Sequence, residues 1–176
     1  MPLPLVSMNH VSFVCRSVQE SVKFYENVLG FVLVKRPSSF NFQGAWLFNY
    51  GIGIHLLESD KVPVKRGEIN PKENHISFQC LDMKIIMKKL DTLKIEYVTA
   101  VVEDGGIKVD QLFFHDPDGY MIEICNCQNL PVLPISTNRK TQAPHLSAED
   151  ALLMMEKEDA LLMMEKLMID LLRISI

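Results

Sequence analysis

A seven-residue segment that occurs twice is the feature that most constrains the fold of this chain. NHVSFVC at residues 9–15 returns as NHISFQC at residues 74–80, with five of the seven positions identical. Both copies alternate as a strand does, so the His, the Ser and the Val or Gln share one face. The other face carries Val or Ile, Phe and Cys, which we expect to pack against a helix. The histidines are then predicted to face a cavity.

The residues after the first copy predict one helix and three strands. Ser17 and Glu20 form the capping-box pattern that starts a helix, and Gly30 lies where such a helix ends. Strand-like runs follow at residues 31–35, 45–50 and 52–57.

The same order of elements follows the second copy. Asp82 can cap a helix with apolar residues at helical spacing, and a DPDG turn lies at residues 116–119. A repeat of about 65 residues is longer than the repeats of solenoids, so it indicates a duplicated module. The sequence predicts an α+β fold with a leader (1–6), two modules (7–58 and 74–128) and a linker between them (59–73).

The last part of the chain has a different composition. Residues 129–147 hold prolines among polar residues and are expected to be irregular, whereas residues 148–176 are expected to form a helical tail. EDALLMMEK occurs at 149–157 and again, unchanged, at 158–166. A nine-residue shift rotates the second copy by half a turn, so the two apolar clusters would face opposite sides. We interpret the tail as a duplication without a cofactor or dimer role, and an amphipathic partner-binding helix is the alternative.

Composition excludes several classes of protein. A hydrophobic content of 48% suits a soluble domain, and a net charge of −4 gives no reason to expect a nucleic-acid partner. We expect no signal peptide and no membrane span, because neither pattern is present. The four cysteines fall in strand-like segments, which predicts reduced thiols and a cytoplasmic location. Cys125 and Cys127 are disfavoured as half of a metal site because no second pair accompanies them.

The ends of the two modules also align, and they place metal-binding side chains at matching positions. His55 in GIHL corresponds to Glu123 in MIEI. Together with His10 and His75, these residues give three imidazoles and one carboxylate on strand positions predicted to face inward. Such donors suit Zn, Ni, Co or Fe. A single His on a strand is more often a core residue than a ligand, but two matched pairs favour a metal site.

These segments resemble the vicinal oxygen chelate superfamily, which includes glyoxalase I, fosfomycin-resistance proteins, methylmalonyl-CoA epimerase and extradiol dioxygenases. The resemblance covers about residues 7–128 and rests on NHVSF, SVKFYENVLG, NHISF and FHDPDGYMIE. The sequence is most similar to plant glyoxalase I-family proteins. The resemblance implies two βαβββ modules that form a cup-shaped mixed sheet, with a metal on its inner face. The matching ligand positions are His10, His55, His75 and Glu123.

The resemblance implies a lyase that isomerises the hemithioacetal of a 2-oxoaldehyde such as methylglyoxal. Glu123 would be both a metal ligand and the catalytic proton carrier, with Zn, Ni or Co favoured as the metal and Fe or Mn as alternatives. Glyoxalase I more often has Glu where this chain has His55. It also tends to carry an Arg that holds a glutathione carboxylate at the position of Val14, and an Asn at the position of Ser59. We therefore expect weak recognition of glutathione.

Two other classes of function remain open from the sequence. One is another enzyme of the superfamily, either an epimerase or an Fe(II) dioxygenase, and the other is a non-catalytic module that binds a small ligand. In each case the expected partner is a small molecule, with a glutathione adduct as the substrate of the lyase. The sequence also leaves open whether the site forms within one chain or across a homodimer.

Overall fold

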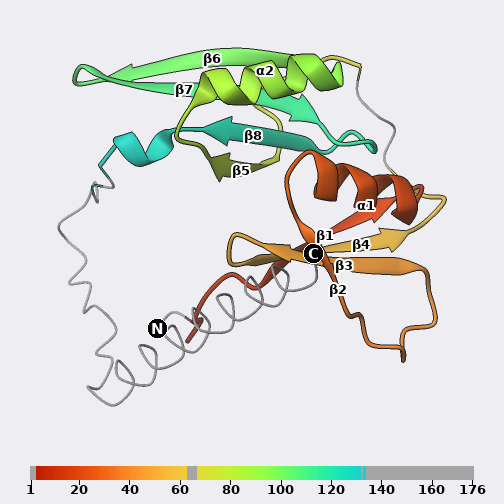
Figure 1. Cartoon of the computed structure of the whole chain (residues 1–176). Helices are drawn as coiled ribbons and strands as arrows, with labels where there is room; N and C mark the ends of the chain where they lie inside the picture. Colours follow the sequence, from red (N-terminus) through yellow and green to blue (C-terminus); the bar gives the residue numbers. More distant parts are fainter. Residues whose placement is uncertain (1–2, 63–66, 132, 134–176) are drawn as a thin grey trace, which may run out of the picture. The chain divides into compact units, whose positions relative to one another are not determined.

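The computed structural model describes residues 3–62, 67–131 and 133, and the chain divides into two units, Met1–Pro131 and Val132–Ile176. The first unit contains two modules (Figure 1). The first module consists of β1 (His10–Cys15), α1 (Val18–Asn27), β2 (Val32–Val34), β3 (Gly44–Asn49) and β4 (Ile52–Glu58). The second consists of β5 (His75–Gln79), α2 (Met83–Leu93), β6 (Tyr97–Asp104), β7 (Ile107–His115) and β8 (Met121–Cys125), followed by η1 (Cys127–Asn129).

The predicted tail at residues 148–176 lies outside the described residues, as does most of the irregular segment before it. None of the described helices is both long enough and apolar enough to cross a membrane.

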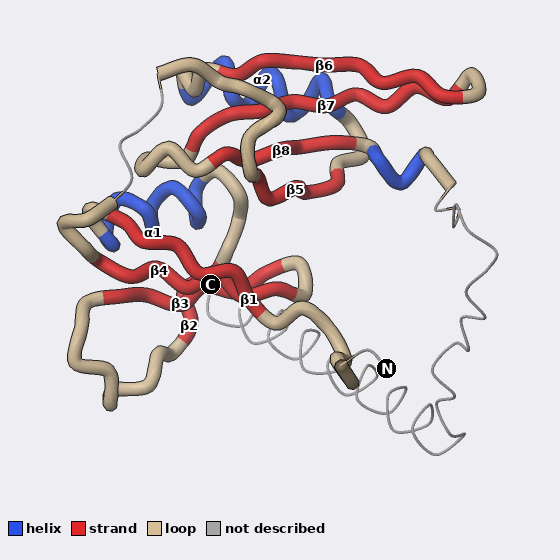
Figure 2. The backbone as a smooth tube through the Cα atoms, turned by 180° about the vertical axis from the view of Figure 1, so that it is seen from behind, coloured by secondary structure: helices blue, strands red, loops and turns tan. Residues whose placement is uncertain are grey.

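The two modules have the same strand pairing, which confirms the predicted α+β fold. The strand order is β1-β4-β3-β2 in one sheet and β5-β8-β7-β6 in the other (Figure 2). In each module the first strand along the chain runs parallel to the fourth, so β1 pairs with β4 and β5 pairs with β8. The other strand pairs are antiparallel. Ser12 pairs with His55 as Ser77 pairs with Glu123, so the two modules correspond residue by residue in these strands. Hydrogen bonding therefore divides the predicted mixed sheet into two sheets of four strands.

Side-chain caps start both helices where the sequence predicted them. Ser17 Oγ accepts a hydrogen bond from the backbone N–H of Glu20 at 3.3 Å. Asp82 Oδ1 accepts two, from the N–H groups of Lys84 and Ile85. These bonds satisfy N–H groups that have no partner within the first turn of a helix. Each cap fixes where its helix begins after the repeated strand.

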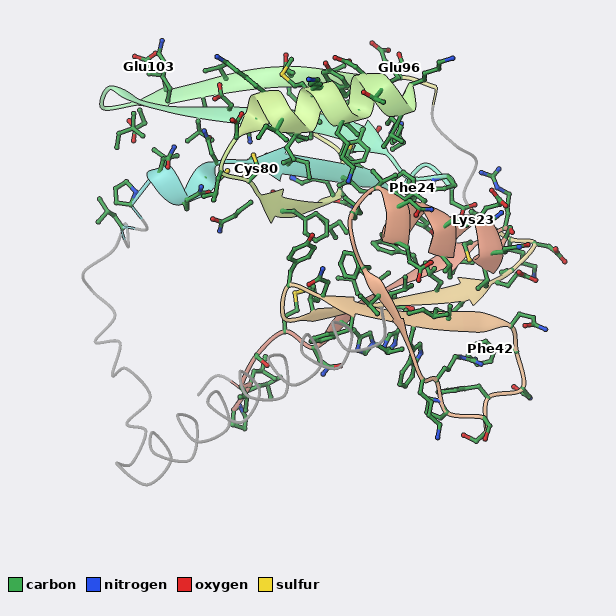
Figure 3. The ribbon with its side chains drawn as sticks, in the orientation of Figure 1. Lys23, Phe24, Phe42, Cys80, Glu96 and Glu103 are labelled. Atoms are coloured by element: carbon green, nitrogen blue, oxygen red, sulfur yellow. The ribbon has the colours of Figure 1, made fainter. Side chains whose placement is uncertain are left out.

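One apolar core joins the helix-facing sides of the two sheets. The Val11 and Phe13 side of β1 packs there, as does the Ile76 and Phe78 side of β5. Phe24 of α1, labelled in Figure 3, contacts the ring of Phe114 from the other module. The buried residues of this core are Cys15, Tyr25, Leu29, Phe31, Ala45, Leu47, Ile54, Leu56, Leu90, Leu112, Phe114, Ile122 and Ile124. Because the apolar sides are used in this way, the opposite sides carry the repeated histidines.

The turn between β7 and β8 attaches the second module to α1. Tyr25 donates a hydrogen bond to Asp116 Oδ2 at 3.1 Å. Asp118 accepts from the backbone N–H and the Nε of Arg16, at 3.1 and 3.0 Å, and from the hydroxyl of Ser21 at 3.1 Å. Both aspartates are buried, and this burial raises the pKa of Asp116. The sequence predicted only a turn here; we call these five residues the module clasp.

Candidate metal centre

His10 and His55 form the first pair of predicted ligands. They lie on the neighbouring parallel strands β1 and β4, and their rings stack with centroids 3.9 Å apart. Gly53 is the strand partner of His10. A Cβ on Gly53 would lie 3.1 Å from the Cβ of His10 and 3.6 Å from Nε2 of His55. The absence of a side chain at this position therefore leaves room for both rings.

The surroundings of His55 favour a neutral imidazole. His10 Nδ1 is 2.8 Å from the side-chain oxygen of Asn9, which orients the ring. Burial lowers the pKa of His55, and the neighbouring His10 lowers it further. The ring of Trp46 stacks on the other side of His55, with centroids 4.2 Å apart. Neutral imidazole is the form that binds a metal ion, so the ring of His55 suits that role.

His75 and Glu123 form the second pair. Nε2 of His75 is 3.2 Å from Oε2 of Glu123, and Nδ1 is 2.7 Å from the backbone oxygen of Glu73. A carbonyl oxygen only accepts hydrogen bonds, so Nδ1 must carry the proton. In a neutral ring, Nε2 then presents a lone pair to a carboxylate oxygen. Two acceptors at this distance require a proton or a cation between them, and a bound metal ion meets that requirement.

Gln111 is a site residue that the sequence analysis missed. Its Nε2 donates a hydrogen bond of 2.6 Å to Oε1 of Glu123. This bond orients the carboxylate so that Oε2 is directed to His75. Strand alternation on β7 puts Gln111 on the same face as Phe113, the partner of Glu123. That alternation was visible in the sequence, but the pairing of β7 with β8 was needed to connect it to Glu123.

The structure brings the four predicted ligands together as two pairs, one in each module. Within the described residues, one group has three or more metal-binding donor atoms within 4.8 Å of one another, and it consists of Glu123, Cys125 and Cys127. Burial and a hydrogen bond with Cys125 raise the pKa of Cys127 to about 12, so its thiol is protonated at neutral pH. The predicted four-residue metal site therefore stays a prediction.

A cavity of about 900 Å³ is lined in one part by His75 of the second pair. His75, Ser77 and Gln79 of β5 line one part of it, and apolar residues line most of the remainder. Its volume is in the range of small-molecule sites. A small ligand with an apolar part can therefore reach His75.

Comparison with known proteins identifies the family. Residues 7–124 match the family model described as Glyoxalase/Bleomycin resistance protein/Dioxygenase superfamily. The chain belongs to this superfamily. The resemblance found in the sequence is thereby confirmed.

Two curated members of the superfamily illustrate the range of similarity. Glyoxylase I 4 of Arabidopsis thaliana is 64% identical over 137 residues, which cover 76% of this chain and 78% of that protein. Metallothiol transferase FosB of Bacillus licheniformis is 29% identical over 149 residues, which cover 81% of this chain and 88% of that protein. The plant protein is thus far more similar to this chain than the bacterial transferase.

Solved structures of the superfamily share the fold. The fosfomycin resistance protein FosX of Listeria monocytogenes aligns with a TM-score of 0.57 at 16% identity, over 69% of this chain and 92% of FosX. A virulence protein of Salmonella typhimurium aligns with a TM-score of 0.52 at 20% identity, over 70% of this chain and 98% of that protein. At such identities the likeness concerns the fold alone.

Proposed function

We propose that this protein is a metal-dependent glyoxalase I-like lyase that isomerises the hemithioacetal of a 2-oxoaldehyde and a thiol. The observation that carries the proposal is the 64% identity over 137 residues to Glyoxylase I 4. The bacterial transferases are distant at about 30% identity. The paired donors of His75 and Glu123 support the same reading, since this reaction needs a carboxylate base beside a cation.

The proposed mechanism assigns the proton transfer to Glu123. A bound divalent ion supplies Lewis-acid stabilisation of the negative charge that develops on two adjacent substrate oxygens. Glu123 removes the proton from the carbon bonded to sulfur and returns it to the neighbouring carbonyl carbon, so no oxidant or second substrate is consumed. Gln111 holds one carboxylate oxygen, and His75 lies beside the other. Burial of Glu123 keeps water away from the transferred proton.

The proposed ligands are His10, His55, His75 and Glu123, with Zn, Ni or Co as the metal and Fe or Mn as alternatives. Imidazole nitrogen suits the first three ions well, and one carboxylate reduces the net charge of the site. Two features of the pairs support this set. The carbonyl-bound Nδ1 of His75 leaves Nε2 for a metal ion, and the lowered pKa of His55 keeps that ring neutral.

We further propose that a homodimer unites the two pairs. β1 and β5 are both first in the strand order of their sheets, so each has one edge without a strand partner. His10 and His75 are the first residues of these two strands. A two-fold dimer that places β1 of one copy beside β5 of the other would make two equivalent four-residue sites. Formation of the site within one chain is the alternative.

The proposed compartment is the cytoplasm. Cys15, Cys80, Cys125 and Cys127 are free thiols, and two of them are buried. Reduced cysteines are typical of proteins from a reducing compartment.

Steady-state kinetics on methylglyoxal and glutathione test the proposed reaction. The metal-free protein is reconstituted in turn with Zn, Ni, Co and Mn, and we expect turnover with at least one of them. Glu123→Gln keeps an oxygen donor but loses the basicity, so turnover should fall by about 100-fold while part of the metal affinity remains. Glu58→Gln serves as the control, because Glu58 caps α1 from the end of β4. Metal binding without turnover for every ion would contradict the proposal.

A further inference from the structure

The segment between β2 and β3 holds an ordered arginine. Arg36 is half-buried although the other residues at 32–40 are exposed. Its guanidinium carbon lies 4.5 Å from the ring centroid of Phe40 and 4.6 Å from that of Phe42, which is labelled in Figure 3. Nη2 donates a hydrogen bond of 3.0 Å to the backbone oxygen of Phe42. These contacts hold the cation in place before any ligand binds, which reduces the entropy lost on binding.

This cation has no carboxylate partner within the part of the chain that the structure describes. The ion pairs found there join other side chains. A guanidinium offers five N–H donors in a planar fork that matches a carboxylate. One backbone oxygen accepts from Arg36, so most of the fork remains for another acceptor. A cation between two aromatic rings often only stabilises a loop, so its position relative to the candidate ligands decides its role.

A row of contacting rings connects this segment to the first pair of candidate ligands. Phe40 lies 5.9 Å from Trp46, and Trp46 stacks on His55 at 4.2 Å. His55 in turn stacks on His10 at 3.9 Å. The rings of Phe40 and Trp46 are only partly covered. They form a surface along which a substrate can extend from the candidate metal centre to Arg36.

The strand register places Arg36 close to His55. A Cβ on Gly44 would lie 3.4 Å from Nε of Arg36, so the guanidinium covers Gly44. Gly44 shares a face with Trp46, the strand partner of His55. Two residues along a strand and one strand across amount to about 8 Å between Gly44 and His55. A hollow of about 530 Å³ next to Arg36 is lined mostly by residues of α1 and β2, together with the start of β3.

We propose that Arg36 binds a carboxylate of the thiol portion of the substrate, while the reacting carbons lie at the metal centre. The inference rests on the proposed lyase function and assigns to Arg36 the selection of thiols that carry a carboxylate. A separation of about 8 Å corresponds to two or three residues of an extended peptide thiol. The contacting rings of Phe40 and Trp46 lie along the part of the substrate between its sulfur and its carboxylate. The guanidinium of Arg36 binds the carboxylate.

Kinetics with two substrates test this role. Arg36→Met keeps the unbranched stem and removes the charge. We expect its KM for the methylglyoxal–glutathione adduct to rise about tenfold or more at unchanged kcat, because a charge-assisted hydrogen bond to the substrate is lost. Its KM for the uncharged 2-mercaptoethanol adduct should not change. Lys35→Met, which removes an exposed cation from the same segment, is the control. Equal losses for both adducts, or no loss for either, would overturn the proposal.

A binding measurement keeps the inference testable if the lyase assay fails. Trp46 is the one tryptophan of the chain and lies within the aromatic row, so its fluorescence reports binding there. Wild-type protein should bind S-methylglutathione about tenfold tighter than its diethyl ester, because only the free acid pairs with Arg36. Arg36→Met should bind both equally, and Lys35→Met should behave as wild type. If wild type and Arg36→Met prefer S-methylglutathione over its diethyl ester to the same extent, the role of Arg36 is refuted, whatever the outcome for turnover.

Discussion

At the scale of single residues, the contact between His75 and Glu123 says most about the chemistry of the site. The backbone oxygen at Nδ1 fixes the tautomer of His75, and the carboxylate of Glu123 faces its other nitrogen at 3.2 Å. Ionised Glu123 and neutral His75 repel each other at this distance unless a cation or a proton lies between them. A metal ion removes the repulsion and uses both lone pairs. The same two atoms are the basis of the proposed metal site and of the proposed catalytic base.

Gln111 is expected to act as a positioning residue for Glu123. Gln111→Ala removes the 2.6 Å hydrogen bond to Oε1, so the carboxylate loses its fixed orientation. We predict a loss of about 10- to 100-fold in metal affinity or in kcat/KM, the usual effect of removing such a partner. Isothermal titration with Zn together with lyase kinetics provides the measurement. Lys108→Ala, an exposed change on the same strand, is the control and should alter neither quantity.

The repeat in the sequence predicted which candidate ligands occupy equivalent positions in the two modules, but not the residues around them. Matching offsets placed His10 with His75 and His55 with Glu123, and the strand registers agree with that match. Trp46 and Gln111 were not predicted, because each contacts a candidate ligand from a neighbouring strand. Cross-strand register depends on tertiary packing, and one sequence does not supply it.

At the scale of elements, the repeated strands and capped helices were predictable because local signals fix them. Ser17 and Asp82 cap the helices through bonds to residues two or three positions away. The module clasp is different, since Asp118 bonds to groups about 100 residues earlier in the chain. A DPDG sequence predicts a turn whether or not its carboxylates are buried. Their burial against α1 follows only once both modules have folded.

The module clasp should contribute measurably to stability. Asp118→Ala leaves the backbone N–H of Arg16 and the hydroxyl of buried Ser21 without their acceptor. We predict a loss of roughly 2–4 kcal/mol in the free energy of unfolding, measured by urea denaturation. Glu20→Ala removes an exposed pair with Lys23 on the same helix and should cost less than about 0.5 kcal/mol. Similar effects of the two changes would show that the clasp does not hold the modules together.

At the scale of the whole molecule, the two pairs of candidate ligands lie one in each module. Each module carries one pair on strands that begin or adjoin an open sheet edge. The repeat makes the pairs equivalent, so a two-fold arrangement of two copies would give two identical sites. This account also explains why the candidate donors in one chain lie as two pairs.

Complementation between two inactive variants tests most directly whether the pairs unite across copies. His55→Ala disables the first pair and Glu123→Gln the second, so each variant alone should have little lyase activity. After unfolding and refolding together in equal amounts, half of the dimers combine one copy of each. Every mixed dimer then contains one intact site, and we predict about a quarter of the wild-type specific activity. Recovery of no activity, with mixed dimers verified by mass, would contradict a centre shared between copies.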